Sequence, residues 1–207
     1  MKNVRVIAHP LIEHKLSILR DIKTESFHFR LLVDEITSLL LFEATRDLTL
    51  QDVEVKTPVA TAKAKRLSQK IMICPILRAA LGMLNSVFNL IPDASVGFLG
   101  FQRDESTLEP EFYYNKLPDD HKDRVTIVID PMFATGGTAI DAVNFLKSKG
   151  IKDIRFLSIV SAVEGLEKFT KIHPDVKVFV ASIDEKLNDK GYIDPGLGDA
   201  GDRVFNT

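Results

Sequence analysis

The clearest hydrophobic pattern in the chain begins at Val125. From there to Ile129 the residues are mostly β-branched and apolar, over the length of a buried strand. Asp130 and Pro131 follow, and proline cannot extend a central strand. Beyond a turn of small residues, apolar positions recur at helical spacing up to Gly150, which suits the position just past a helix end. We therefore predict a strand, a glycine turn and a helix over 125–150.

The rest of the chain alternates between the same two patterns. Apolar residues spaced by three and four predict helices, and short apolar runs predict buried strands. Strands alternating with helices indicate an α/β fold with a parallel sheet, and the length suits a single domain over 1–207. The predicted helices cover 11–19, 26–40 (capped by Thr24 or Ser26), 76–91 and 166–172, and the further buried strands cover 71–74, 94–101, 154–160 and 176–181.

Four segments lack a clear apolar period. Residues 48–60 alternate only in part, which predicts edge strands or a hairpin, and 61–69 are polar and basic, as in a solvated connection. Residues 102–120 hold acids and prolines with little periodicity, so we expect either a loop that closes over a site or disorder. The glycine-rich 191–203 is predicted to be a loop that contacts ligand rather than core.

Composition narrows the class of protein. Apolar residues make up 45% of the 207 and support a real core, while a net charge of −2 excludes a general nucleic-acid surface. The single cysteine, Cys74, excludes an internal disulfide and fits a reducing compartment. No apolar run approaches 18 residues. We expect a cytoplasmic protein that contacts neither membrane nor nucleic acid.

The turn at 134–138 has two interpretations. Two glycines and two threonines make a serviceable βα connection. However, an acid at the strand end followed by hydroxyls and glycines also pairs a carboxylate with backbone N–H groups at a helix start, which favours phosphate. The triphosphate P-loop is excluded because no Gly-Lys-Ser/Thr is present. We predict a phosphate site.

Three motifs resemble the uracil phosphoribosyltransferases, a family of type I phosphoribosyltransferases. Residues 127–143, IVIDPMFATGGTAIDAV, are similar to the motif for phosphoribosyl diphosphate (PRPP), with proline after the aspartate as in the uracil enzymes. Residues 191–203, GYIDPGLGDAGDR, are similar to the uracil-binding segment, and 75–82, PILRAALG, to the pyrophosphate loop. The resemblance runs from His9 to the C-terminus. It implies the type I parallel-sheet fold with N-terminal helices and a flexible hood, which 102–120 would form.

The resemblance also implies roles for individual residues. Arg78, Asp130 and Asp199 would be the catalytic residues. Magnesium would be bound through PRPP and waters near Asp199, with no ion held directly by the protein. Uracil would be bound by Tyr192, Ile193, Gly198, Asp199 and Ala200. PRPP would be bound by Arg78, Arg103, Asp130, Pro131, Met132, Phe133, Ala134, Thr135, Gly136, Gly137, Thr138 and Asp199.

For some residues a structural role is the alternative to ligand binding. Arg103 could instead pair with Asp104 or Glu105 on the surface. Asp202 and Arg203 are expected to pair with each other or with the backbone rather than touch substrate, so we leave them out of the catalytic residues. The chain departs from the usual pattern of the family at Phe133, Ala80 and Asp194, and Ala80 puts the backbone geometry of the pyrophosphate loop in question.

The expected reaction is uracil plus PRPP to UMP plus diphosphate, in pyrimidine salvage. Two alternatives stay open at this point: a phosphoribosyltransferase for another base, and a PRPP-binding regulatory protein. Expected partners are uracil and PRPP, in a homodimer or higher homo-oligomer. The resemblance also allows a GTP effector, although no residue in the sequence decides that point.

Overall fold

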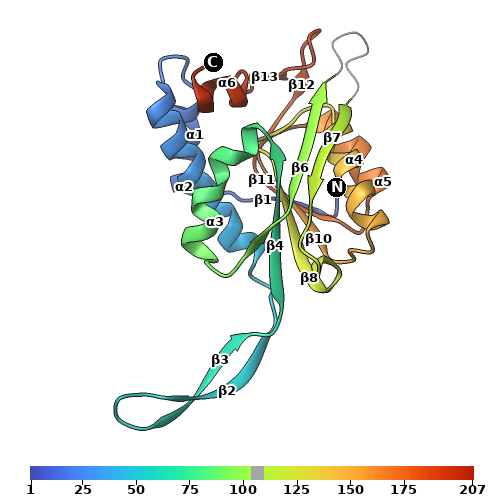
Figure 1. Cartoon of the computed structure of the whole chain (residues 1–207). Helices are drawn as coiled ribbons and strands as arrows, with labels where there is room; N and C mark the ends of the chain where they lie inside the picture. The colour runs from blue at the N-terminus through green and yellow to red at the C-terminus, as the bar shows by residue number, and fades with distance from the viewer. Residues whose placement is uncertain (104–109) are drawn as a thin grey trace.

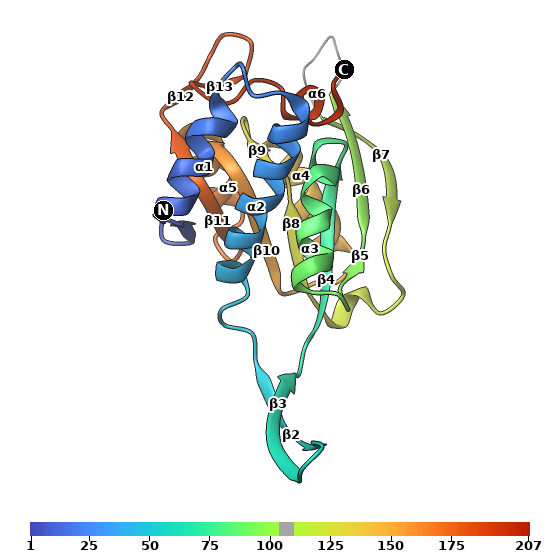
Figure 2. The ribbon, with the colours of Figure 1, turned by 90° about the vertical axis from the view of Figure 1, so that its left-hand side faces the viewer.

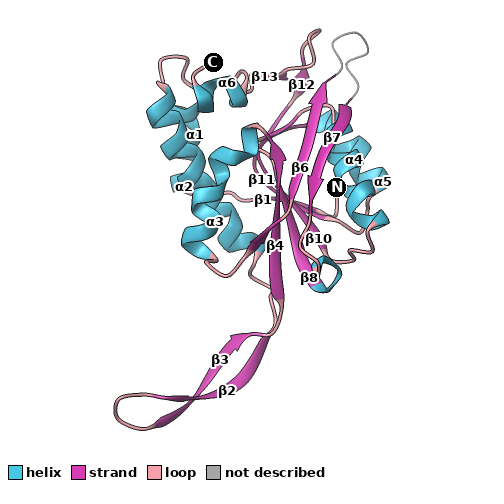
Figure 3. Ribbon diagram, viewed as in Figure 1, coloured by secondary structure: helices cyan, strands magenta, loops and turns pink. Residues whose placement is uncertain are grey.

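A mostly parallel sheet forms the centre of the protein (Figures 1 and 3). The computed structural model describes residues 1–103 and 110–207 of the chain. All neighbouring strands of the sheet are parallel except β7, which runs antiparallel to β6. In sheet order the strands are β1 (Val4–Val6), β11 (Lys177–Asp184), β10 (Ile154–Ala162), β8 (Arg124–Ile129), β4 (Lys70–Leu77), β6 (Phe98–Arg103) and β7 (Pro110–Lys116), with β5 (Ser95–Val96) beside β4 and β9 (Met132–Phe133) beside β10.

Helices cover both faces of this sheet (Figures 1 and 2). One face is covered by α1 (Pro10–Arg20), α2 (Ser26–Ala44) and α3 (Leu84–Leu90), and the other by α4 (Gly137–Ser148) and α5 (Val163–Ile172). A separate cluster of buried apolar side chains lies under each set of helices. The central strands are buried on both faces, which is why they read as continuous apolar runs. Among the described residues, no helix is both long and apolar enough to cross a membrane.

The carboxyl ends of the parallel strands meet at one edge of the sheet. Pro75 of β4 lies opposite Ile129 of β8, which in turn lies opposite Leu157 of β10. At this edge lie the short strands β12 (Lys186–Leu187) and β13 (Ile193–Asp194) and the short helix α6 (Ala200–Phe205) (Figure 1). Ligands of open α/β sheets bind at this edge, so the candidate site is sought here.

The expected α/β sheet is confirmed, and three local predictions are wrong. The segment 102–120 is not aperiodic throughout, because 110–116 form strand β7 at the sheet edge. A 3-10 turn, η2 (His121–Asp123), follows it. The supposed connection 61–69 is strand β3 (Thr61–Leu67), which pairs with β2 (Leu50–Lys56) in a hairpin that projects from the body (Figure 2). The glycine-rich C-terminal segment contains α6.

Two smaller details also differ from the prediction. Neither Thr24 nor Ser26 caps α2: the helix begins after Glu25, and no side chain caps it. Strand β4 continues through Pro75 to Leu77, and the residues beyond Arg78 form a 3-10 turn, η1 (Ala79–Met83), before α3. Pro75 is tolerated within the strand because it lies where β4 passes from pairing with β5 to pairing with β6.

Candidate active site

The predicted phosphate turn lies between β8 and the start of α4. Gly136 has φ +79°, in the left-handed region that favours glycine, and helix α4 begins at the next residue. The first N–H groups of an α-helix have no partner within the helix, so they face outward at its positive end. A cavity of about 170 Å³ opens here, lined by Asp130, Met132, Phe133, Ala134, Thr135, Gly136, Thr138 and Ala139.

The backbone of this turn is held in place by strand β10 and helix α5. The N–H groups of Ile159 and Val160 both donate to the carbonyl of Pro131, at 3.2 and 3.1 Å. Gly165 packs so closely that a Cβ placed there would lie 1.9 Å from the carbonyl oxygen of Ala134. Gly165 is a supporting residue that sequence reasoning missed, because only the three-dimensional contact shows why glycine is needed.

Phe133 lines the cavity and is almost fully buried. Its side chain is buried among Phe156 and Phe169, with ring centroids 4.9 and 5.3 Å away. The departure from the usual family residue is thus a core position beneath the turn, and edge-to-face packing of the rings fixes β9 against the sheet.

Asp130 stands half-buried at the end of β8, on the wall of the cavity. Burial raises the pKa of its carboxyl to about 7, partly offset by a long hydrogen bond (3.5 Å) from the N–H of Met132. The carboxylate is therefore poorly satisfied in the free protein. A ligand that donates hydrogen bonds to it would relieve that cost.

This raised pKa predicts a pH-dependent stability. Protonated Asp130 favours the folded state, so its contribution is complete below the ordinary carboxyl pKa near 4 and is lost as pH rises through about 7. Asp130→Asn is neutral throughout, so its unfolding midpoint should exceed that of the wild type more at pH 8 than at pH 5. Thermal unfolding at both pH values measures the difference, and a difference independent of pH would refute this account of Asp130.

Arg78 lies at the same edge, one strand away from Asp130. It is exposed, follows β4 directly and precedes η1, and the peptide bond between Leu77 and Arg78 is cis. The adjoining Ala79 approaches α6, since a Cβ placed on Gly201 would lie 3.8 Å from that of Ala79. Ala80, the departure in this loop, is fully buried in the core. The structure thus brings Arg78 and the segment around Asp199 to the same part of the molecule.

The predicted base segment forms a second cavity beside the first. It measures about 290 Å³ and is lined by Met132, Ala134, Gly191, Tyr192, Ile193 and Asp199. Met132 and Ala134 line both cavities, so the phosphate turn and the base segment adjoin. Gly198, at φ +79°, and Ala200, the first residue of α6, flank Asp199 without lining the cavity.

Asp199 also has a structural role that the sequence did not indicate. It is the N-cap residue of α6, and its carboxylate accepts a hydrogen bond of 2.9 Å from the N–H of Asp202. Arg203 donates to the carbonyls of Leu197 and Asp21, at 2.9 and 2.7 Å, which confirms the expectation that it pairs with the backbone.

Other predicted residues contribute less to these cavities. Pro131 is buried behind the turn, and neither it nor Gly137 lines the 170 Å³ cavity. The backbone of Arg103 ends β6, while its side chain lies outside what the structure describes, as do residues 104–109 of the expected hood. Asp194, the third departure, forms an ion pair with Lys186 at 3.4 Å.

Comparisons with known proteins point to one family. The family model described as "Uracil phosphoribosyltransferase" matches residues 6–207. Curated relatives of that name are 72% identical in Campylobacter fetus subsp. fetus and 55% identical in Staphylococcus carnosus, each over the whole chain and 99% and 100% of the relative.

Solved structures show the same fold. The AQ2163 protein from Aquifex aeolicus superposes with a TM-score of 0.93 at 38% identity, covering 98% of this chain and 97% of that one. The adenine phosphoribosyl transferase of Trypanosoma brucei, at 12% identity and a TM-score of 0.60, covers 96% and 89% and shows the fold alone. The architecture is that of the type I phosphoribosyltransferases.

Proposed function

Because the chain belongs to the uracil phosphoribosyltransferase family, we propose that the two adjoining cavities at the strand ends are its active site. The chain is a pentosyltransferase of pyrimidine salvage: it joins uracil to the phosphoribosyl group of PRPP and releases UMP and diphosphate. The observation that supports this placement is the sharing of Met132 and Ala134, which puts a phosphate turn and a base pocket side by side.

Each part of the site would hold one part of the substrates. The 5′-phosphate would lie in the turn from Ala134 to Thr138, where the backbone N–H groups and hydroxyls at the start of α4 donate to its oxygens. The ribose hydroxyls would donate to Asp130. The diphosphate would face Arg78, with Arg103 as a second cation, because guanidinium offers forked donors at fixed charge.

Uracil would lie in the second cavity, which Tyr192 and Ile193 line. The backbone of Ile193, and of Gly198 and Ala200 on either side of the lining residue Asp199, would bind its edge. Transfer of the ribose carbon to the base nitrogen places positive charge on the sugar and negative charge on the departing diphosphate. The protein then acts by positioning the base against the sugar carbon and by stabilising charge at the leaving group.

Magnesium fits the donor chemistry of this site. The carboxylate oxygens at the two cavities belong to Asp130 and Asp199, and hard oxygen ligands suit Mg²⁺. Among the described residues, no group of three His, Cys, Asp or Glu side chains could hold a metal ion. We propose that the ion is held by the diphosphate and waters with Asp199 nearby, where it would neutralise phosphate charge.

The other partners are proposed on narrower grounds. A homodimer or higher homo-oligomer is supported by the projecting β2–β3 hairpin, on which Val59 is 94% exposed. A GTP effector and a cytoplasmic location rest on the sequence expectations alone. The organisation as a single domain over 1–207 is supported by the continuous sheet, because β1 near the N-terminus pairs in it with β11 near the C-terminus.

Two alternatives considered from the sequence lose ground to these findings. The family match and the full-length relatives are uracil phosphoribosyltransferases, which favours an enzyme for uracil over a regulator or an enzyme for another base. The deciding assay incubates the protein with PRPP, Mg²⁺ and a panel of bases and follows diphosphate release. Among the bases, only uracil is expected to cause diphosphate release. Diphosphate release with a purine but not with uracil would overturn the proposed function.

Arg78 is expected to stabilise the negative charge on the departing diphosphate. Arg78→Ala should lower kcat/KM about 10²- to 10³-fold, the scale for losing one preorganised charge-stabilising donor. Arg5→Ala is the matched control and should retain activity, because it removes another exposed arginine that lies on the edge strand β1, pairs with Glu43 and lines neither cavity. Steady-state kinetics measure both, and a loss confined to the KM for uracil would show that Arg78 has a different role.

A further inference from the structure

The base segment is fastened to the body of the protein by a buried ion pair. Arg20, the last residue of α1, grips both carboxylate oxygens of Asp184, the last residue of β11, at 2.7 and 2.6 Å. The side chain of Asp184 is 4% exposed and that of Arg20 22%. A forked pair of this kind is geometrically specific, and breaking it leaves an unpaired buried charge.

Both groups of the ion pair also bind Gly196. The N–H of Gly196 donates to Asp184 at 2.9 Å, and the carbonyl of Gly196 accepts from Arg20 at 2.6 Å. The residue thus has its two backbone groups held by opposite members of one ion pair. Gly196 has no room for a side chain, since a Cβ on it would lie 2.1 Å from the carbonyl oxygen of Ile193.

Ser182 completes the arrangement. Its hydroxyl donates to Asp184 and accepts from Arg20, each at 3.1 Å. Burial raises the pKa of Asp184, but the hydrogen bonds from Arg20 and Gly196 outweigh that effect and hold the pKa below its ordinary value. Asp184 is accordingly a carboxylate at neutral pH, and the ion pair is intact.

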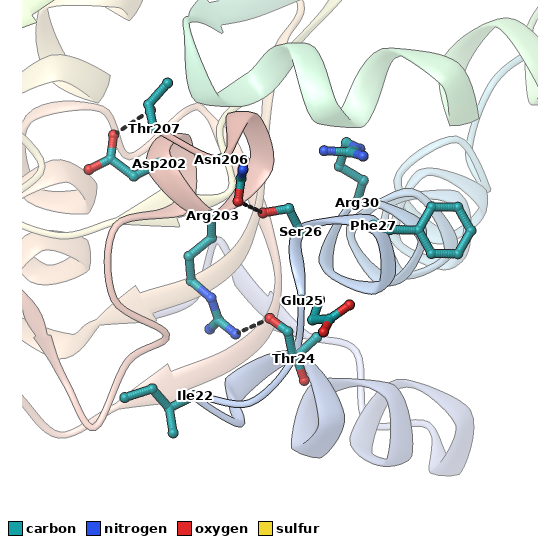
Figure 4. A pocket seen from close by; sticks show the side chains of 10 residues that line it. All are labelled: Ile22, Thr24, Glu25, Ser26, Phe27, Arg30, Asp202, Arg203, Asn206 and Thr207. Atoms are coloured by element: carbon teal, nitrogen blue, oxygen red, sulfur yellow. Dashed lines mark hydrogen bonds between the residues drawn. The ribbon is translucent and has the colours of Figure 1, made fainter.

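Leu197, the residue after Gly196, is held by a second arginine. Arg203 of α6 donates to the carbonyl of Leu197, stacks 4.3 Å from the ring of Phe29, and reaches toward Thr24 (Figure 4). An open cavity of about 720 Å³ lies beside Arg203, and none of the predicted binding residues lines it. Arg203 is therefore part of the support behind the base segment.

We propose that Arg20 and Asp184 are positioning residues for uracil. By fixing Gly196, they set the place and direction of the backbone groups two to four residues later, at Gly198 and Ala200. Neither side chain lines the base cavity, so they act on the base only through the segment. The inference rests on the proposed function, because it takes Gly198 and Ala200 to be the groups that read uracil.

The test compares the substrates separately. Arg20→Lys keeps the charge but loses the fork, so a lysine cannot hold the carboxylate and the Gly196 carbonyl in the same way. The KM for uracil should rise about 10- to 100-fold, the scale for a small misplacement of a binding group, while the KM for PRPP changes less than about twofold. The preference for uracil over cytosine should fall in parallel.

The chain offers a matched control in Arg124. Its guanidinium grips both oxygens of Asp120 at 2.7 and 2.9 Å, at the opposite end of the strands from the site. Arg124→Lys therefore removes an equivalent fork and should leave the KM for uracil and the base preference unchanged. This control separates positioning of the base from a general loss of stability.

A milder variant, Ser182→Ala, keeps the proposal testable if Arg20→Lys does not fold. It should raise the KM for uracil about two- to tenfold, the scale of one ordinary hydrogen bond. An unchanged KM for uracil in a folded Arg20→Lys, or in Ser182→Ala if only that variant folds, would overturn this inference while wild-type UMP formation left the proposed function standing. Absence of UMP formation by the wild type would overturn the proposed function itself.

Discussion

Cytosine should be a worse substrate than uracil by about 10⁴-fold or more in kcat/KM. The expectation follows from the proposal that the N–H of Ala200 donates to O4 of uracil and that a carbonyl near Gly198 accepts from N3–H. Cytosine presents an amino group to the donor and an unprotonated nitrogen to the acceptor. Leaving buried polar groups unpaired supports discrimination on this scale, far beyond that of a missing methylene.

The geometry of the segment supports this reading of the base. Ala200 is the first residue of α6, so its N–H has no partner within the helix. Gly198 has φ +79°, a backbone conformation that residues with a side chain rarely adopt. The recognition thus lies in the main chain, and a change of side chain at Asp199 should spare it.

Competition between the two bases measures the preference directly. Uracil and cytosine are supplied together with PRPP and Mg²⁺, and UMP and CMP are quantified from one reaction. Asp199→Asn is the informative variant, because asparagine retains the N-cap of α6 while removing the charge. Its turnover should fall while its base preference persists. Comparable kcat/KM values for the two bases in the wild type would show that the base segment is misplaced.

Gly136→Val should weaken PRPP binding about 10³-fold or more. The residue has φ +79°, and a Cβ on it would lie 2.8 Å from the carbonyl oxygen of Gly165. Valine would therefore displace the turn and its N–H donors. Hydrogen bonds to a charged group are each worth about 1.5–3 kcal/mol, so losing two or three of them accounts for the magnitude.

The control for Gly136→Val is Gly150→Val, at the other end of the same helix. Gly150 has φ +86°, so the substitution brings comparable backbone strain, but its nearest neighbour is the flexible side chain of Lys122. Calorimetric titration with PRPP should show near-normal affinity in this control. Unchanged PRPP affinity in a folded Gly136→Val would mean that the turn does not hold the phosphate.

The strand, turn and helix around the phosphate turn are readable from the sequence. The predicted strand over 125–129 is observed as Arg124–Ile129, and Gly150 has the predicted conformation past the end of α4. This segment is predictable because burial on both faces, a proline stop and helical periodicity all favour the same boundaries. The buried strands β10 and β11 follow the same logic.

The missed elements are those that lie at edges or are very short. Strand β7 pairs on one side only and carries exposed Tyr113 and Tyr114, so no buried apolar run marks it. In β3 the less exposed positions are Ala62 and Ala64, which give little hydrophobic contrast against the intervening charges. Helix α6 has six residues, too few for a periodic pattern to emerge.

The candidate site is predictable in its ligand-facing motifs and unpredictable in its supports. The turn is one continuous stretch of sequence, and so is the base segment. Arg20 and Asp184, in contrast, are separated by 164 residues and meet only in the fold. Gly165 likewise shows its reason for being glycine only against the backbone of Ala134. Such contacts depend on tertiary packing, which a local pattern does not encode.

The central claim is that the turn at 134–138 and the segment at 192–200 form one active site for phosphoribosyl transfer to uracil. Its most direct test quantifies UMP and diphosphate formed from uracil, PRPP and Mg²⁺ by the wild type, Gly136→Val and Gly150→Val. The account predicts one UMP and one diphosphate for each PRPP consumed by the wild type and Gly150→Val, and loss of both products in Gly136→Val. Diphosphate release without UMP, or equal turnover by a folded Gly136→Val, would contradict it.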